Sequence, residues 1–454
     1  MRLIIAIAIC KLLYFIGSRI GRGSSLPGQV ALAVCPGALK QIKLPDIIVA
    51  VTGSNGKTST VEFLSRALQG CGMKVGWNRE GANQIEGAAT LLLRMATFRG
   101  RVNRDALVLE CDERYARKLF EVIKPSIMIV TNLCRDQMTR NGHHEFIQSC
   151  ISTAIDAAGA GMTLVLNADD PYVAALANAS ANANVVWFGV GADVVLQNSG
   201  YRAPDIGYSS FLRYDDGAFC PVCKERFTYD YRVTAHMGGY RCGACGFSRP
   251  EPDYCVTGLN YKTGAVALDG GITTRLKFPS LTGAYNLVAA IAAAGTAGVK
   301  AEDSARALDG YELTGGRTVY LAADGRDGIL LVSKHENSLS YNHSLSWLAG
   351  QGRQCTVVIL VDSISRKYYT SETSWLWDVD FDILADDNVR SVVLAGRYVN
   401  ELAARFAFTA IDPGKIGYVP DTGRLREYVK DNTTGYIYAV TCFSDKEKLI
   451  KAFA

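Results

Sequence analysis

The sequence is poor in several features that would place it in a simple class of protein. It has only five histidines among 454 residues, and its formal net charge of +4 gives no electrostatic case for nucleic-acid binding. It carries no acidic or basic tail, and apolar residues make up 48% of the chain, which argues against extended disorder. At about 150 residues per domain, this length predicts two or three globular domains.

A long uninterrupted apolar run is also missing. The most apolar stretch, residues 3–17, contains Lys11 and is shorter than the roughly 20 residues that span a bilayer. No small-residue cleavage site follows it, which argues against a signal peptide. Arg19 and Arg22 come next, without an acid, so the segment predicts either a helix on an anionic membrane surface or a helix packed on the protein's own core. We expect a cytoplasmic protein, with peripheral contact at the inner face of the cell membrane under the first alternative.

Short β-branched runs alternate with helical stretches in the first part of the chain. Strand-like runs fall at residues 45–52, 104–110, 126–131 and 162–167. Strands separated by helices predict an α/β fold with a parallel sheet, in which ligands bind beyond the carboxyl ends of the strands. The polar residues at those ends are Thr52, Glu110, Asp112, Glu113, Asn132 and Asn167. We therefore expect the chemistry to gather at that edge of the sheet.

Residues 52–58 (TGSNGKT), directly after the first strand, have the composition of a phosphate-binding loop. Gly53 and Gly56 allow a tight path that turns backbone N–H groups inward, and the following helix adds the positive end of its dipole. Lys57 would reach the outer phosphates of ATP, and Thr58 would offer its hydroxyl to Mg²⁺. The predicted ATP-binding residues of the loop are Gly53, Ser54, Asn55, Gly56, Lys57, Thr58 and Ser59.

Four of the thirteen cysteines form two matched pairs, and the other nine are scattered singly. Cys220-Pro-Val-Cys223 and Cys242-Gly-Ala-Cys245 have 18 residues between them, a spacing typical of a zinc ribbon. A Cys₄ site has no open position for water, so we expect a structural Zn²⁺ that holds a small insert at about residues 208–255. Two matched pairs argue against a redox motif, and the insert is too weakly basic to indicate nucleic-acid binding.

The strand and helix pattern restarts in the last third of the chain. Strand-like runs at residues 328–333, 356–362, 391–395 and 436–441 predict a separate C-terminal α/β domain. We therefore expect an N-terminal helical segment (1–40), an ATP-binding domain that carries the insert (41–315) and a C-terminal domain (316–454).

Several motifs together resemble the Mur ligase family. Residues 51–59 (VTGSNGKTS) are similar to its ATP loop, which has no glycine at the first position of the general phosphate-loop motif. Further similar motifs follow in order at residues 78–83 (NREGAN), 109–113 (LECDE), 167–171 (NADDP), 283–286 (GAYN) and 316–317 (GR). The resemblance implies a Mur ligase-type parallel-sheet ATPase domain, a C-terminal Rossmann-like domain, and a reaction that joins a carboxylate to an amine through an acyl phosphate.

The same resemblance implies roles for residues outside the loop. It places Asn286 and Arg317 at the nucleotide, and either Glu113 or Glu110 beside Thr58 on Mg²⁺. A carboxylate such as Glu110 could equally serve as the acid at a helix N-terminus. The candidates near the carboxylate substrate are Glu80, Asn83 and Arg135.

The ribbon sequence and residues 374–381 (SWLWDVDF) resemble the amidating branch of this family. In that branch the α-carboxylate of D-glutamate in lipid II is phosphorylated, and ammonia then gives D-isoglutamine. No cysteine here sits in a strand–helix elbow with a histidine partner, as a glutaminase nucleophile requires. The resemblance therefore implies a separate GatD-type glutaminase subunit as partner and lipid II as substrate, with no role for nucleic acid.

An aspartate of the ligase subunit is thought to complete the Cys-His pair of that glutaminase, where it would orient and charge the imidazole. Asp362, after a strand-like run, is our match for this catalytic residue. The surrounding residues depart from the family pattern in spacing, so Glu372 and Asp378 stay open as alternatives. Residues 334–339 (KHENSL) depart from it as well.

Two other functions stay open. One is a different Mur-like ligase that adds an amino acid, similar to folylpolyglutamate synthase, which the ribbon and residues 374–381 disfavour. The other is a non-enzyme, an ATP-regulated zinc protein that binds nucleic acid or scaffolds a complex. The intact pair Lys57 and Thr58 and the low net charge argue against it.

Overall fold

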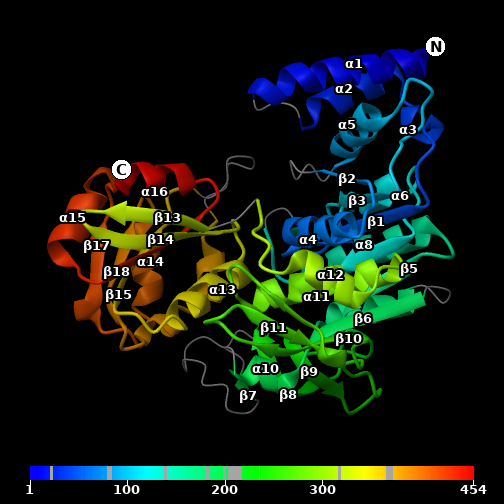
Figure 1. Ribbon diagram of the computed structural model, residues 1–454. Coiled ribbons are helices and arrows are strands. Elements are labelled where there is room, and N and C mark those ends of the chain that lie inside the picture. The colour runs from blue at the N-terminus through cyan, green and yellow to red at the C-terminus, as the bar shows by residue number, and fades with distance from the viewer. Residues whose placement is uncertain are drawn as a thin grey trace. The chain divides into compact units, whose positions relative to one another are not determined.

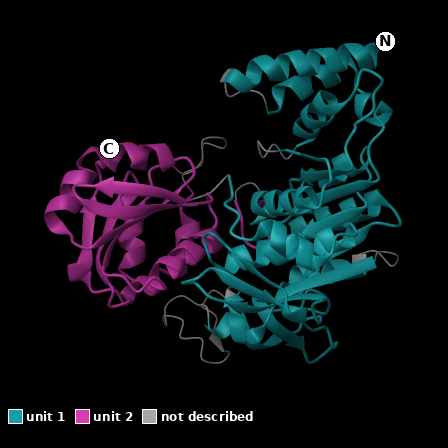
Figure 2. Cartoon of the chain, in the orientation of Figure 1, with its two compact units in different colours: residues 1–133, 144–200, 217–314 teal, residues 134–143, 201–216, 315–454 magenta. Residues whose placement is uncertain are grey.

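A computed structural model of the chain describes residues 1–20, 24–78, 84–137, 141–179, 184–197, 201–202, 217–234, 236–314, 318–363 and 372–453. The chain forms two compact units (Figure 2). Unit 1 contains residues 1–133, 144–200 and 217–314, and unit 2 contains residues 134–143, 201–216 and 315–454. Each unit has its own sheet and its own core, so each is described by itself.

Unit 1 is built on a nine-stranded sheet with the order β12-β11-β10-β6-β5-β4-β1-β3-β2 (Figure 1). The strands are β1 (Ile47–Thr52), β2 (Val75–Trp77), β3 (Ala106–Glu110), β4 (Ile127–Val130), β5 (Thr163–Asn167), β6 (Asn184–Val190), β10 (Tyr254–Leu259), β11 (Ala265–Leu268) and β12 (Thr273–Arg275). The pairs from β10 to β2 are all parallel, and β11 and β12 add an antiparallel edge. The central strands are buried along nearly their whole length, which explains their continuous Val, Ile and Leu runs.

Helices cover both faces of this sheet. They are α1 (Arg2–Gly17), α2 (Leu26–Val34), α3 (Ala38–Gln41), α4 (Lys57–Gly70), α5 (Ile85–Met95), α6 (Ala116–Phe120), α8 (His144–Ala158), α9 (Pro171–Ala174), α10 (Ala192–Gln197), α11 (Leu281–Thr296) and α12 (Ala301–Leu308). Successive residues of β1 point to opposite faces. Val49 and Val51 pack in the core with α4, α11 and α12, whereas Ile48 and Ala50 pack in the core with α1, α2, α5 and α8.

A hairpin of β8 (Phe227–Thr234) and β9 (Met237–Cys242) stands apart from the large sheet and carries the cysteine pairs at its open end. Among the described residues, none of the helices combines the length and the apolar character needed to cross a membrane.

Unit 2 has a six-stranded sheet with the order β13-β14-β18-β15-β16-β17. The strands are β13 (Thr318–Ala323), β14 (Arg326–Ser333), β15 (Cys355–Leu360), β16 (Val389–Ala395), β17 (Ile416–Val419) and β18 (Tyr436–Cys442). All pairs are parallel except β13 with β14. Helices α13 (Ser338–Ala349) and α14 (Val399–Phe406) pack on one face, and α15 (Leu425–Asn432) and α16 (Lys446–Phe453) pack on the other.

The segment 134–143 belongs to unit 2 although the chain on both sides of it belongs to unit 1. Its buried Asp136 forms an ion pair with Lys334 and accepts a hydrogen bond from Asn337 Nδ2 at 2.9 Å. The N–H of Gln137 donates to the carbonyl of Glu336 at 3.0 Å. The segment is therefore tied to the turn between β14 and α13.

The predicted α/β fold class is confirmed, with the expected strands at β1, β3, β4, β5, β14, β15, β16 and β18. The sequence did not predict the strands β6, β10 and β13, or the shorter strands β2, β11, β12 and β17. The four shorter strands have three or four residues, too few to establish an alternating apolar pattern.

Candidate nucleotide and metal sites

The loop between β1 and α4 requires glycine at two positions. Gly53 has φ 127° and Gly56 has φ 84°, both in the region that side chains rarely adopt. A Cβ at position 53 would lie 2.2 Å from Thr131 Oγ1, and a Cβ at position 56 would lie 2.1 Å from Asn286 Oδ1. The predicted nucleotide residue Asn286 thus comes from α11 to pack directly against the loop, although 230 residues separate it from Gly56.

The end of β4 holds the loop in shape. Asn132 accepts hydrogen bonds from the N–H of Ser54 at 2.8 Å through its carbonyl and from the N–H of Asn55 at 3.0 Å through Oδ1. Its side chain donates back to the carbonyl of Asn55 at 3.1 Å, and Thr131 Oγ1 donates to the same carbonyl at 2.6 Å. Asn167, at the end of β5, donates to the carbonyl of Thr131 at 2.8 Å. The shape of the loop is therefore held by hydrogen bonds from the ends of β4 and β5.

Lys57, the first residue of α4, points back into this loop. Its Nζ contacts the carbonyl of Gly53 and lies 2.5 Å from Glu113 Oε1. Both Lys57 and Glu113 are buried, with exposed fractions of 8% and 3%. A buried charge is stable only when it is paired, so Glu113 holds the ammonium in place at the helix N-terminus, where phosphates bind well.

Thr58 faces a different carboxylate. Its Oγ1 donates to Glu110 Oε2 at 2.8 Å, and the N–H of Glu110 is fixed by Asn78 Oδ1 at 3.0 Å. A hydroxyl and a carboxylate side by side are hard oxygen ligands of the kind that Mg²⁺ prefers. The residues present therefore fit Mg²⁺, which Thr58 and Glu110 could hold while Glu113 is engaged by Lys57.

Cys111 lies between these acids but is not a nucleophile. Burial, together with the charges of Glu110, Asp112 and Glu113, raises the pKa of its thiol far above the ordinary value. The thiol therefore stays protonated at neutral pH.

The structure does not bring the other predicted site residues together at the phosphate-binding loop. Arg317, Glu80 and Asn83 lie outside the described residues. Arg135 lies in unit 2, where its Nη1 is 3.2 Å from Asp378 Oδ2. The contacts of Thr131 and Asn132 with the loop were not predicted from the sequence, in which Asn132 was recognisable only as a polar residue at a strand end. That position after β4 was the only available signal that either residue would meet the loop.

The four paired cysteines converge on one point beside the β8–β9 hairpin. Their Sγ atoms all lie within 4.8 Å of one another, with 3.7 Å between Cys220 and Cys245 and 3.4 Å between Cys223 and Cys242. A tetrahedral Zn²⁺ with bonds of about 2.3 Å places its sulfurs roughly 3.8 Å apart. These separations are too long for disulfides and fit a Cys₄ metal site.

The two cysteine pairs have similar backbone turns. In the first, the N–H of Lys224 donates to the carbonyl of Cys220 at 2.9 Å, and in the second the N–H of Gly246 donates to that of Cys242 at 3.1 Å. Both Lys224 and Gly246 have positive φ. Hydrogen bonds from the N–H groups of Cys245 and then Ala244 lower the pKa of Cys242 to about 7, whereas burial raises the pKa of Cys220, so one thiolate is favoured among the four sulfurs.

The hairpin is attached to the large sheet through residues 168–170, which follow β5, and Asp169 makes most of the contacts. Asp169 Oδ1 accepts from Arg249 Nε at 2.5 Å, and Oδ2 accepts from Tyr285 Oη at 2.6 Å and from the N–H of Val190 at 2.9 Å. The N–H of Gly238 in β9 donates to the carbonyl of Asp169 at 2.8 Å. Asn286, which follows Tyr285 in α11, packs against the phosphate-binding loop. Helix α11 therefore contacts both the loop and Asp169, to which the hairpin is bound.

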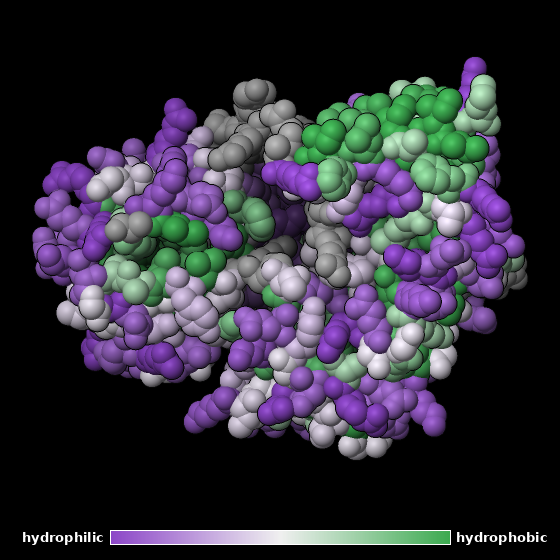
Figure 3. Space-filling view, turned by 45° about the horizontal axis from the view of Figure 1, so that its top comes forward, coloured by the Kyte–Doolittle hydropathy of each residue, from purple (hydrophilic) through white to green (hydrophobic). Residues whose placement is uncertain are grey.

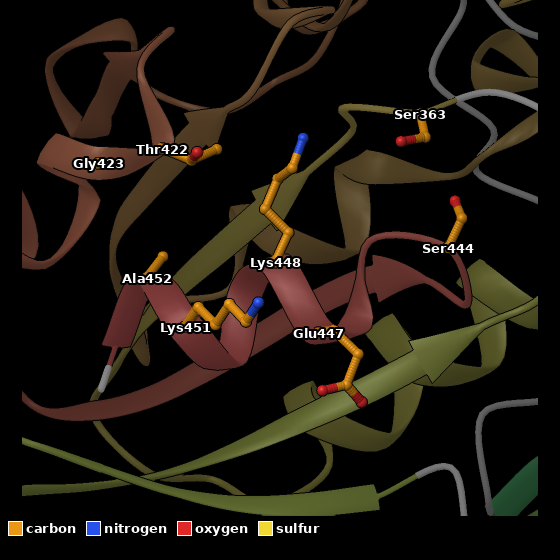
Figure 4. A pocket seen from close by; sticks show the side chains of 8 residues that line it. All are labelled: Ser363, Thr422, Gly423, Ser444, Glu447, Lys448, Lys451 and Ala452. Carbon is orange, nitrogen blue, oxygen red and sulfur yellow. The ribbon is translucent and has the colours of Figure 1, made fainter. Parts of the chain in front are cut away.

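In unit 2, Asp362 follows β15 and is held on both oxygens. Oδ1 accepts from the N–H of Arg397 at 2.9 Å, and Oδ2 pairs with Lys448 of α16. Asp445 Oδ2 accepts from the N–H groups of Asp362 and Ser363, both at 2.9 Å. Beside this group lies a pocket of about 430 Å³ (Figure 4). It is lined by Ser363, Thr422, Gly423, Ser444, Glu447, Lys448, Lys451 and Ala452.

The two alternatives to Asp362 have other partners. Hydrogen bonds from the hydroxyl and N–H of Ser374 lower the pKa of Glu372, and Asp378 pairs with Arg135. Residues 374–378 form a 3₁₀ turn that buries Trp375 and Leu376 in the core of unit 2. The specific sequence of this turn thus serves packing as well as any docking role.

Two family models match the chain and together cover more than half of it. The Mur ligase middle domain matches residues 51–217, and the MurT ligase C-terminal domain matches residues 335–444. The MurT subunit of lipid II isoglutaminyl synthase (glutamine-hydrolyzing) from Staphylococcus aureus (strain N315) is 27% identical over 90% of this chain and 88% of that protein. The MurT subunit from Streptococcus pneumoniae (strain ATCC BAA-255 / R6) is 27% identical over 95% and 92%.

Solved structures show the same fold. A pseudomurein peptide ligase type C from Methanothermus fervidus aligns with a TM-score of 0.70 at 18% identity, over 92% of this chain and 80% of that one. MurF from Acinetobacter baumannii aligns with a TM-score of 0.63 at 15% identity, over 94% and 80%. The chain therefore belongs to the Mur ligase family and is a ligase. Within that family it is of the MurT type, because both the C-terminal model and the relatives along nearly its full length are MurT.

Proposed function

We propose that this chain is the ATP-using ligase subunit of an enzyme that amidates lipid II during peptidoglycan synthesis, converting the D-glutamate α-carboxylate of the stem peptide to D-isoglutamine. The main support is the loop in which Lys57 meets Glu113 and Thr58 meets Glu110, in a chain similar to MurT from end to end. In the first pair, the ammonium of Lys57 can offset negative charge on the outer phosphates of ATP. In the second pair, the oxygens of Thr58 and Glu110 can bind Mg²⁺.

The reaction takes two steps. A carboxylate oxygen of D-glutamate attacks the γ-phosphorus of ATP, ADP leaves, and an acyl phosphate forms. The lone pair of ammonia then attacks the acyl carbon, the bond to the phosphate oxygen breaks, and phosphate and a proton are released. Bound Mg²⁺ would neutralise phosphate oxygens. Lys57 offsets charge on the β and γ phosphates, which develops as the phosphoryl group moves.

Nucleotide and substrate would be positioned by the remaining residues. Asn286, which packs against Gly56, is proposed to contact the nucleotide together with Arg317. Glu80, Asn83 and Arg135 are proposed for the carboxylate substrate.

Ammonia is proposed to come from a GatD-type glutaminase subunit. The relatives are named as subunits of a glutamine-hydrolyzing synthase, and this supports such a partner. Asp362 is proposed to orient a histidine of that partner, because it follows the carboxyl end of β15, precedes the pocket residue Ser363 and is held from two sides. Since its substrate carries a lipid, the enzyme is placed at the inner face of the cell membrane.

The test measures phosphate release and product mass with ATP, glutamine, a lipid-linked muropeptide and the glutaminase subunit. Lys57→Ala should lower kcat/KM for amidation by about 10²-fold or more, because it removes a positive charge from the transferring phosphoryl group. Lys262→Ala is the matched control, since Lys262 is exposed on a turn between β10 and β11.

Full amidation by Lys57→Ala would refute the proposed phosphate site. A product that carries an added amino acid in place of an amide, formed without glutamine, would instead establish the alternative of an amino-acid-adding Mur ligase.

A further inference from the structure

Helix α1 is apolar on both of its faces. One face packs into the core of unit 1 through Ala6, Ile7 and Cys10, against α2 and α5. The opposite face is exposed and carries large apolar side chains, each between 43% and 58% exposed: Ile4, Ile5, Leu12, Phe15 and Ile16. At 3.6 residues per turn these positions fall on one side of the helix, opposite the buried residues, and form one apolar stripe. Figure 3 shows this stripe as a continuous hydrophobic area at the N-terminal end of unit 1.

A helix at the surface of a soluble protein normally has a polar outer face. Two more large apolar side chains are exposed nearby: Phe98 at 54%, whose ring meets Lys11 of α1, and Leu26 at 49%, the first residue of the neighbouring α2. A contiguous apolar patch of this kind marks a surface that another apolar phase covers. The two alternatives predicted for this segment are therefore compatible, because one face serves the core and the other is left for a ligand.

The N-terminal part of the sequence carries charge of one sign only. The first 45 residues contain no acidic side chain and six basic ones: Arg2, Lys11, Arg19, Arg22, Lys40 and Lys43. The ammonium of Lys11 lies over the Phe98 ring at 5.5 Å, and the guanidinium of Arg19 lies over the Phe15 ring at 3.8 Å. Long basic side chains thus border the apolar stripe, with their apolar stems lying along it.

We propose that the exposed face of α1 binds the surface of an anionic phospholipid bilayer, with the helix lying in the plane of the membrane. The apolar stripe enters the boundary between headgroups and acyl chains, and the basic residues pair with lipid phosphates. At 1.5 Å per residue, the 16 residues of α1 span about 24 Å, which is short of a bilayer core of about 30 Å. A second copy of the chain is a poor occupant, because it would bring a second set of positive charges against the first.

This inference names the surface that would carry the ligase to a lipid-linked substrate, and to that extent it rests on the proposed function. Binding through α1 confines the protein to the plane that holds the substrate. Membrane binding needs no ATP, glutamine or partner subunit, so it can fail while the ligase chemistry stands, and the reverse also holds.

The first test is sedimentation of the full chain with vesicles of phosphatidylglycerol and phosphatidylcholine, and with vesicles of phosphatidylcholine alone. We expect binding to the mixed vesicles that is at least tenfold stronger than to the neutral ones and weakens with salt. Leu12→Glu with Phe15→Glu should reduce it at least tenfold, and Lys11→Gln with Arg19→Gln should weaken it mainly on the anionic vesicles. The matched control, Tyr320→Glu with Tyr418→Glu, changes two exposed side chains of unit 2 and should bind like wild type.

The second test locates the contact. Phe15→Trp should show a blue-shifted emission with vesicles and quenching by brominated acyl chains, relative to the wild-type background, whereas Tyr320→Trp should show neither. The proposal is overturned if the paired glutamate variant of α1 binds vesicles as wild type does, or if the added emission of the Phe15→Trp variant is insensitive to brominated lipid. It is also overturned if the wild type is a dimer that the same glutamate variant dissociates without any change in vesicle binding.

Discussion

At the scale of single residues, Lys57 and Thr58 are neighbours in sequence but meet different carboxylates. Lys57 opens α4 and turns back toward Gly53 and Glu113, whereas Thr58 points toward Glu110. The motif alone left both glutamates open for Mg²⁺. The contacts separate them, because a carboxylate paired with an ammonium 2.5 Å away has less to offer a cation than one beside a hydroxyl.

This difference can be measured with isosteric changes. Glu110→Gln should raise the Mg²⁺ concentration required for half-maximal activity by about 10- to 100-fold, with kcat largely recovered at high Mg²⁺, because one ligand is weakened. Glu113→Gln should lower kcat without such recovery, because Lys57 loses its partner. Titrating Mg²⁺ at saturating ATP distinguishes the two, and an exchange of these behaviours between the variants would reverse our assignment.

Much of this site could be predicted from the sequence, but its supporting contacts could not. Gly53, Gly56, Lys57 and Thr58 are recognisable because a phosphate loop needs those residue types at that spacing. Asn132 supports the loop through hydrogen bonds that depend on β4 lying next to β1, and local sequence does not determine strand order.

At the scale of elements, the β8–β9 hairpin is tied to the nucleotide side of unit 1 through residues 168–170, of which Asp169 also contacts α11. Asp169 receives Arg249 from beyond the hairpin and Tyr285 from α11, and all three side chains are largely buried. Because Asn286 follows Tyr285 and packs on Gly56, the position of α11 depends in part on a hairpin that would be closed by metal.

Loss of the metal should therefore change both the stability of the protein and its binding of ATP. Cys223→Ser should abolish bound zinc, lower Tm by about 5 °C or more, and raise the KM for ATP, because the hairpin loosens and Arg249 leaves Asp169. Metal analysis, thermal unfolding and ATP kinetics measure these three effects. Cys71→Ser is the matched control, an exposed single cysteine that should keep all three values.

If Cys223→Ser lost zinc and stability but kept the KM for ATP, the hairpin would be a local structure without influence on α11. The cysteine pairs themselves were predictable, because two matched C-x-x-C motifs have few other uses. Asp169 was predictable only as part of a turn, since its three partners come from β6, the hairpin region and α11.

At the scale of the whole molecule, the chain is proposed to work with a second subunit that hydrolyses glutamine. Asp362 is the residue through which the two activities would meet. Its carboxylate is held by the N–H of Arg397 and by Lys448, so it is oriented before a partner arrives. Glu372 and Asp378 are likewise engaged, by Ser374 and Arg135, so all three carboxylates stay candidates for this role and Asp362 is the one proposed.

The matching experiment compares two sources of ammonia in the reconstituted complex. Asp362→Asn should lower glutamine-dependent amidation by about 10²-fold or more, because the partner's imidazole loses its charge partner. Amidation with added ammonium chloride should stay near wild type, since the ATP site is untouched. Asp324→Asn, which changes an aspartate paired with Arg426 on the same unit, should leave both rates unchanged. Equal loss with both ammonia sources would show that Asp362 supports folding instead.

The short segment 134–143 has a consequence for how this protein can be divided. Unit 2 is not a contiguous stretch of chain, because Asp136 supplies the carboxylate that satisfies Lys334 and the fully buried Asn337. A gene fragment that begins after residue 314 would omit that carboxylate. The buried Asn337 amide would lose this acceptor, at a cost on the order of 1–3 kcal/mol, and the half-buried Lys334 would lose this ion pair. A chimaera that exchanges the C-terminal domain between relatives therefore has to exchange residues 134–143 as well. We expect these two parts of the sequence to change together in evolution.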